Sequence, residues 1–300
     1  MRPDVFAAVM ATGIVSIAAA DHGYRWITDI LAVLAAGGLV VLVVLAVISW
    51  RREPLDLRDP DVVVRLFTFV AACAVLDSRL ADIAGVGWTL GTIALIVWMV
   101  LVAVAVRAMA SRRWSELRDQ SHGAWELASV GTSGLVIVLA QLDRLRVVAM
   151  VLWVVAIAIY CLMTALILGR AFAARLDPNG FEPDGWILMG GLAIATLAAD
   201  RLHSGFAVVT WIAATLWIPP LLYYGIRHLQ RPQARRFDAV WWGMVFPLGM
   251  YSAATYATAV NTGWASLREV SLVFFWVAFA VWLVVAVAGL VQLTTTRSRT

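Results

Sequence analysis

The chain of 300 residues contains no lysine, two cysteines and few charged side chains of any kind. All 23 basic residues are arginines, and charged residues make up 14% of the sequence, against about 25% in soluble proteins. The net charge of +4 is scattered, with no basic cluster among stacking aromatics, so nucleic acid is not an expected partner. Cys73 and Cys161 lie in separate apolar segments, which excludes a disulfide framework.

Enzyme motifs are missing as well. The sequence has neither a glycine-rich phosphate loop nor a serine nucleophile motif. Its four histidines, His22, His122, His203 and His228, fall in connecting segments and are too widely spaced for a ligand cluster. We therefore expect no catalytic residue, no cofactor and no metal site.

What the chain does have is apolar sequence: 62% of its residues are hydrophobic, with a mean hydropathy of +0.86. A membrane-spanning helix needs about 20 such residues in succession. Ten blocks of about this length occur, over 5–20, 28–49, 62–80, 88–109, 125–141, 147–169, 185–200, 206–226, 241–260 and 270–292. They predict an all-α integral membrane protein, with one transmembrane domain of ten helices over 1–300.

The first block follows Arg2, as the core of a secretion signal would. Thr12, Gly13 and Ser16 interrupt this block, whereas a signal core is usually rich in leucine. We therefore interpret 5–20 as a retained span. All connections are short, which places the function within the lipid bilayer.

Arginine counts in alternate connections predict the orientation, because basic residues near span ends stay in the cytoplasm. With the amino end inside, sixteen arginines lie on the inner side and six on the outer side. Both termini are therefore expected in the cytoplasm, and the protein in a bacterial plasma (inner) membrane.

Odd and even blocks differ in composition. The odd blocks begin near residues 5, 62, 125, 185 and 241, a period of about 60 that suggests five helical hairpins. Glycine, serine and threonine account for 19 of 88 residues in the odd blocks and for 14 of 111 in the even blocks. The even blocks are suited to lipid contact and the odd blocks to a shielded interior.

Two explanations fit the small residues of the odd blocks. They allow close helix packing, which suffices for Gly131, Gly134, Gly190, Gly191 and Gly249. Alternatively, the odd blocks line an axial path and offer hydroxyl groups to a passing solute, which the difference between the blocks favours. The candidate pore-lining residues are Thr12, Gly13, Ser16, Thr68, Thr132, Ser133, Gly191, Gly249, Ser252 and Thr255.

Charged residues in the spans are candidates for function, and here they lie near the span ends. Arg65 and Glu126 fall at the inner ends, where Arg65 could reach the headgroups, pair with Glu126 or attract anions. Glu126 could instead bind protons in a coupled carrier. At the outer ends, Asp77 with Arg79 and Asp200 with Arg201 are expected as exposed pairs, or as a filter for charge.

Four segments carry a resemblance to a known family: PDVFAAVMATGIVSIAAA (3–20), FTFVAACAVLDSRL (67–80), PDGWILMGGLAIATLAA (183–199) and WWGMVFPLGMYSAATY (241–256). They resemble the tellurite-resistance/dicarboxylate transporter family, which includes a bacterial tellurite-resistance anion channel, plant slow anion channels, a yeast malate permease and fungal sulfite pumps. The resemblance implies five hairpins in a quasi-fivefold ring, with odd helices lining a central pore and even helices outside. It also implies a homotrimer with one pore in each protomer.

In channel members of the family, a phenylalanine on the ninth helix blocks the pore, and the W-W-x-x-x-F-P pattern assigns that role to Phe246. Pro247 removes one helix hydrogen bond beside it, which permits local bending. The fifth block departs from the family pattern G-G-W-L-L-x-x-V-x-T-Q, since Glu126 follows Trp125 and Ser133 stands in place of the glutamine.

Two functions follow as expectations. The first is an anion channel of the plasma membrane that moves small inorganic anions through an uncharged pore gated by Phe246. The second is a secondary carrier of C4-dicarboxylates such as malate, with or without proton coupling. Efflux of sulfite or tellurite-related anions is a third use of the same fold.

Overall fold

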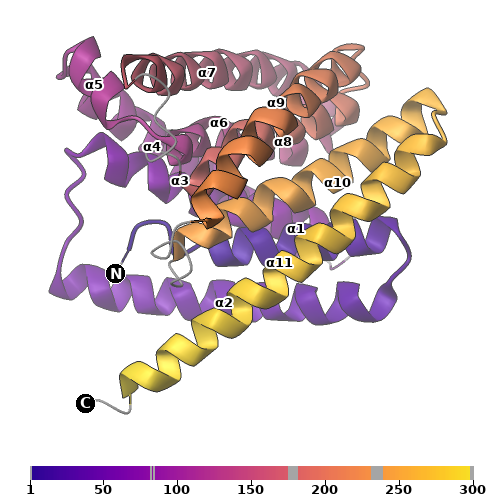
Figure 1. The fold of residues 1–300 in the computed structure, drawn as a ribbon, viewed down its shortest axis with the longest axis horizontal. Helices are drawn as coiled ribbons and strands as arrows, with labels where there is room; N and C mark the ends of the chain where they lie inside the picture. The colour runs from indigo at the N-terminus through magenta and orange to yellow at the C-terminus, as the bar shows by residue number, and fades with distance from the viewer. Residues whose placement is uncertain (1, 82, 84, 175–181, 231–238, 298–300) are drawn as a thin grey trace.

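The computed structural model describes residues 2–81, 83, 85–174, 182–230 and 239–297, and this part of the chain contains helices and no strand (Figure 1). Every predicted block falls on a helix, so the all-α prediction is confirmed. The odd blocks form the helices that we call inner: α1 (Ala7–Asp21), α3 (Pro60–Arg79), α6 (Leu127–Ala140), α8 (Ile187–Arg201) and α10 (Trp242–Thr262). The even blocks form the outer helices: α2 (Arg25–Arg52), α4 (Val86–Ala110), α7 (Arg146–Ala173), α9 (Phe206–Leu229) and α11 (Ser266–Arg297).

Each inner helix packs against the outer helix that follows it in the chain, which gives the hairpins α1–α2, α3–α4, α6–α7, α8–α9 and α10–α11. The inner helices also pack on one another, α1 on α3, α3 on α6, α6 on α8, α8 on α10 and α10 on α1. They start at one end of the molecule, which we call the amino end, and finish at the other, the carboxyl end.

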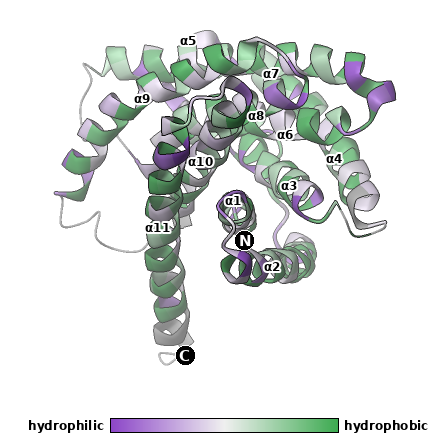
Figure 2. Ribbon diagram, turned by 90° about the vertical axis from the view of Figure 1, so that its right-hand side faces the viewer, coloured by the Kyte–Doolittle hydropathy of each residue, from purple (hydrophilic) through white to green (hydrophobic). Residues whose placement is uncertain are grey.

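Inner and outer helices differ in what they contact. Among the described residues, six helical segments are long and apolar enough to cross a membrane, and five of these lie on the outer helices, whose most apolar windows are at most 22% buried. The sixth, Gly123–Ala140, contains α6 and is 89% buried. The outer helices are largely hydrophobic along their length, as Figure 2 shows for α2, α4, α7 and α11 around α1. They are suited to face lipid, and they shield the inner helices from it.

Several inner helices start with a short turn at the amino end. The 3₁₀ turns η1 (Gly123–Glu126), η4 (Pro183–Trp186) and η6 (Ala239–Trp241) lead into α6, α8 and α10. Pro60 opens α3, where its missing N–H costs nothing, and Asp59 caps that helix by accepting from the Asp61 amide. The sequence did not predict α5 (Trp114–Gln120), a short helix between α4 and η1.

Candidate functional site: the core of the inner helices and its two ends

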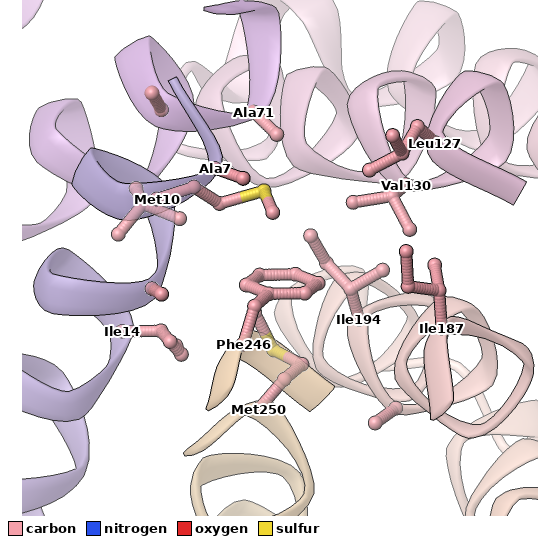
Figure 3. Packing of buried hydrophobic residues seen from close by; sticks show 14 of the residues in the cluster. Ala7, Met10, Ile14, Ala71, Leu127, Val130, Ile187, Ile194, Phe246 and Met250 are labelled. Carbon is pink, nitrogen blue, oxygen red and sulfur yellow. The ribbon is translucent and has the colours of Figure 1, made fainter. Parts of the chain in front are cut away.

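Phe246 of α10 is fully buried at the centre of the inner helices. Figure 3 shows its ring facing Met10 of α1, Val130 of α6 and Ile194 of α8, with Met250 one turn further along α10. We call Met10, Val130, Ile194, Phe246 and Met250 the apolar plug. All five belong to one core cluster and none is more than 1% exposed, so water is excluded here.

Close helix contacts hold Phe246 in this position. A Cβ atom on Gly190 of α8 would lie 2.9 Å from Cγ of Pro247, so these helices touch beside the ring. On the other side of α10, a Cβ on Gly249 would lie 3.1 Å from Cγ2 of Ile14 in α1. Glycines therefore bring both neighbouring helices against α10 at the level of the plug, as the packing explanation predicts.

A cavity of about 210 Å³ lies on the carboxyl-end side of the plug. Ile14, Ile194 and Met250 line it and also surround Phe246 in Figure 3, so the cavity ends at the plug. Its charged lining residues are Asp21, Arg79 and Arg201, and residues of all five inner helices contribute to its walls. We call it the carboxyl-end vestibule.

A wider cavity of about 630 Å³ lies at the amino end. Charged and polar side chains line it: Asp56, Asp59, Asp61, Arg65, Arg112, Asp119, Gln120, His122, Arg170 and Glu182. Its lining includes no residue of the apolar plug, so this amino-end cavity borders the start of α3 and the ends of outer helices.

Arg65 connects two inner helices at the amino end. Its Nη1 donates to Oδ2 of Asp4, 3.0 Å away at the start of α1, and its Nε donates to Oδ2 of Asp61, 2.9 Å away in α3. The prediction that Arg65 pairs with Glu126 is therefore wrong. Asp61 lies four residues before Arg65, one helical turn away, and reaches it more easily.

His122 lies between two carboxylates. Its Nδ1 is 2.6 Å from Oδ2 of Asp184, and its Nε2 is 2.6 Å from Oδ1 of Asp61. Only the doubly protonated ring can donate to both oxygens. Burial on its own would lower the pKa of His122, but the hydrogen bonds and charges of Asp184 and Asp61 raise it to about 9. We call Asp61, His122 and Asp184 the histidine clamp, since it joins the starts of α3, α6 and α8.

A glycine permits this arrangement. A Cβ on Gly123 would lie 2.2 Å from the carbonyl oxygen of Asp184, so only glycine allows η1 to approach η4. The amide of Ala124 then donates to Oδ2 of Asp184 over 3.0 Å.

Within the described part of the chain, no group of three or more His, Cys, Asp or Glu side chains is arranged to hold a metal ion.

Glu126 is fully buried and points toward α7. One of its carboxylate oxygens accepts from Thr164 Oγ1 over 2.7 Å and the other from Ser129 Oγ over 2.9 Å. Among the described residues it has no ion-pair partner. Its contacts lie between α6 and α7, so it is separate from the charges that line the amino-end cavity.

The charged residues at the carboxyl end are not paired as expected. Asp77 is 3% exposed and accepts from Gln141 Nε2 over 3.2 Å, while Arg79 donates to Ser16 Oγ and to Asp29. The predicted exposed pair of Asp77 with Arg79 is therefore wrong. Asp200 makes no ion pair with Arg201 in the described ranges, and its Oδ1 is buried without a hydrogen-bond partner there.

Three of the candidate pore threonines bond to tryptophans of outer helices. Trp282 of α11 donates through Nε1 to Thr12, Trp98 of α4 to Thr132, and Trp211 of α9 to Thr255, over 2.9, 2.9 and 3.0 Å. Each tryptophan belongs to one hairpin and its acceptor to the inner helix of the next. Trp153 of α7 repeats the contact on the carbonyl oxygen of Ala195 in α8.

The other candidate residues also make contacts between helices or within one. Ser16 donates to the carbonyl of Thr28, Ser252 to that of Ser271, and Thr68 to that of Arg65. A Cβ atom would press on Val75 if added to Gly13, and on Tyr160 if added to Gly191. Ser133 is buried, and its hydroxyl has no partner among the described residues.

The histidine clamp was not expected from the sequence, although a signal for it is present. The dipeptide Pro-Asp occurs at 3–4, 60–61 and 183–184, just where α1, α3 and η4 begin. Aspartate at a helix start is favoured by the helix dipole, so these three aspartates mark one end of the molecule. His122, which precedes η1, meets two of them.

The whole inner core is matched by a known family. Residues 1–290 match the family described as voltage-dependent anion channel. The chain belongs to this family. Its match covers all inner and outer helices nearly to the end of α11, which confirms the resemblance drawn from the four segments.

Individual proteins similar to this chain carry less specific names than the family does. An uncharacterized transporter of Methanocaldococcus jannaschii is 23% identical over 322 residues, covering 93% of this chain and 90% of its own. An uncharacterized membrane protein of Mycobacterium tuberculosis is 31% identical over 157 residues, covering 47% of this chain and 80% of its own. The chain is thus a membrane protein of a channel and transporter family.

Proposed function

We propose that the protein is a gated anion channel whose pore follows the axis of a quasi-fivefold ring of inner helices, closed here at Phe246. One observation carries the proposal: the Phe246 ring lies at the centre of side chains from neighbouring inner helices, at the point where a vestibule that contains arginines ends. A dry apolar constriction of this kind stops ions until it is opened.

The amino end is proposed to face the cytoplasm of a bacterium, with the carboxyl-end vestibule outside the cell. The support is the excess of arginines, sixteen against six, in connections on the amino-end side. Small anions would enter from either side past arginines, including Arg65, Arg79 and Arg201, and meet no fixed charge at the plug. Weak binding along such a path favours anions that lose water easily, such as chloride and nitrate.

The decisive experiment compares anion flux in liposomes for the wild-type protein, Phe246→Ala and Phe275→Ala. Phe275 of α11 is equally buried but lies among His22, Tyr24 and Trp276, away from the axis. Both changes remove the same atoms from the core and cost about 3–5 kcal/mol of stability. Only Phe246→Ala is expected to raise chloride flux, by about tenfold or more, because it alone removes the ring that closes the path. Absence of anion flux in the wild type and in Phe246→Ala would disprove the proposal.

A secondary carrier of C4-dicarboxylates is the second candidate, and Glu126 is the observation that favours it. This carboxyl group is fully buried, held by two hydroxyls and without an ion-pair partner among the described residues. Such a group is suited to take up a proton. Malate uptake that saturates, depends on pH and is lost in Glu126→Gln would support the carrier. A chloride flux that is linear in concentration and unaffected by Glu126→Gln would support the channel.

We further propose a homotrimer with one pore per protomer. The family resemblance supports this, and the large exposed apolar surface of the outer helices offers room for both lipid and protomer contacts. Native mass spectrometry should give three times the chain mass of 32.7 kDa. A monomeric species alone would contradict it.

A further inference from the structure

A side cavity of about 370 Å³ lies at the carboxyl end between α3, α4 and α6, away from the axis of the inner helices. Its walls are mainly apolar and include Leu95, Val138 and Leu142. Trp88 and Thr92, on the first turns of the outer helix α4, form an exposed edge. The cavity therefore lies on the surface that the outer helices present to lipid, at the level where helices end and headgroups begin.

Asp77 is the charged residue in this cavity. It is 3% exposed, and its Oδ2 accepts from Gln141 Nε2, which lines the same cavity. Its Oδ1 lies beside Gly91, where an added Cβ would come within 3.1 Å of it. No arginine or histidine of the described ranges is within ion-pair distance of Asp77. Arg79, two residues later in α3, donates instead to Ser16 and Asp29. A buried carboxylate of this kind is costly unless a cation joins it.

The surroundings define what cation would fit. A carboxylate and an amide oxygen accept hydrogen bonds, so a group with several N–H donors and a positive charge complements them. The indole of Trp88 adds an aromatic face, which attracts ammonium groups. The apolar walls require that the rest of the ligand be hydrocarbon. A membrane lipid meets all three requirements.

We propose that this cavity binds a phospholipid with a primary ammonium headgroup, such as phosphatidylethanolamine, with Asp77 and Gln141 as its polar contacts. Arg144 of η2 is exposed next to Leu145, which lines the cavity, and can meet the lipid phosphate. The lipid neutralises Asp77 where α3, α4 and α6 meet. The site is separate from the proposed pore, because its lining shares no residue with that of the carboxyl-end vestibule.

The test is native mass spectrometry of the full-length protein in detergent, titrated with lipids of identical acyl chains. Phosphatidylethanolamine has the N–H donors, phosphatidylcholine has the charge without the donors, and phosphatidylglycerol has neither. The wild type is expected to bind phosphatidylethanolamine about tenfold more tightly than phosphatidylglycerol, with phosphatidylcholine between them. Asp77→Asn should remove this preference. Asp143→Asn, an exposed residue in η2 at the same end, makes the same charge change and should retain it.

A second variant leaves the carboxylate in place. Thr92 is exposed, so Thr92→Phe should fold normally, fill the cavity and abolish the preference with Asp77 intact. Equal binding of the three lipids to the wild type, or a preference that survives in both variants, overturns the proposal. If both variants instead change the oligomeric state and leave lipid binding unaltered, a neighbouring protomer occupies the cavity and the proposal also fails. Anion flux is not measured, so failure here does not affect the channel proposal.

Discussion

The Nδ1 atom of His122 lies 2.6 Å from Oδ2 of Asp184, across the gap between the starts of two neighbouring inner helices. On its other side the ring meets Asp61 of α3 at the same distance. Three inner helices are thus joined at one end by a single imidazolium ion. Since a charged ring is required, the strength of this connection depends on pH.

We expect stability to fall at alkaline pH because of His122. Its pKa of about 9 in the folded protein exceeds the ordinary 6.5, so its contribution is complete below about pH 6.5 and is lost as pH rises through 9. The midpoint of thermal unfolding should therefore drop between pH 7 and pH 10. In His122→Asn this drop should shrink, and stability at pH 7 should be about 2 kcal/mol lower.

His203→Asn is the matched control for that experiment. His203 is exposed at the carboxyl end with a positive φ of 52°, a conformation that asparagine accepts. It should leave the pH dependence unchanged. A wild-type profile identical to that of His122→Asn would show that the histidine clamp contributes no stability.

Gly123→Ala should be strongly destabilising, whereas Gly37→Ala should not. The new Cβ at position 123 would lie 2.2 Å from the Asp184 carbonyl oxygen, so η1 and η4 must separate and the histidine clamp with them. Gly37 in α2 has nothing within 4 Å of its Cβ position, and alanine there should stabilise the helix by up to about 1 kcal/mol. Thermal unfolding of the two variants should shift in opposite directions. A tolerated Gly123→Ala would contradict the close approach.

Thr12→Val should weaken the protein without altering anion selectivity. Valine cannot accept from Trp282, and a buried indole N–H without a partner costs about 1–3 kcal/mol. Thr132→Val and Thr255→Val should behave alike, because Trp98 and Trp211 lose the same bond. Thr89→Val on the exposed face of α4 is the control. If these three changes instead shift the chloride-to-nitrate ratio with stability intact, their hydroxyls line the path.

Arg201→Gln should reduce anion flux at low salt by about two- to fivefold, because a positive charge at a narrow mouth concentrates anions. The reduction should fade above about 0.5 M salt, where the Debye length falls below about 5 Å. Arg268→Gln removes an exposed charge from the same end, outside the vestibule lining, and should have little effect. Liposome flux at two salt concentrations measures both. If Arg201→Gln reduces flux equally at both salt concentrations, its charge does not act by attracting anions to the mouth.

Hydropathy alone was enough to find the inner and outer helices, because each apolar block has the length and continuity of one helix, but it missed the short polar helix α5. The partners of polar side chains were harder to predict. Asp61 and Arg65 are one turn apart and could have been paired from the sequence, but Asp184 reaches His122 only after helix packing has brought the turns η1 and η4 together. That packing is not encoded in any local pattern.

The directions of the hydroxyl groups could not be predicted for a related reason. A helix with one wet face shows a polar stripe, whereas α6 and α10 are buried on nearly every side. Thr132 and Thr255 therefore look the same in sequence whether they face the axis or an outer helix. The tryptophans that donate to these hydroxyls lie 34 and 44 residues away, so no local pattern predicts the two hydrogen bonds.

The bond between Thr12 and Trp282 joins residues that are 270 positions apart. It brings the last hairpin against the first, and α10 packs on α1 at the same junction. During synthesis α1 enters the bilayer early but remains without this neighbour until nearly the whole chain has been made. The contact between the first and last hairpins therefore forms last. A chain that stops before α11 lacks the outer helix that covers α1 and α10, so these inner helices are exposed to lipid.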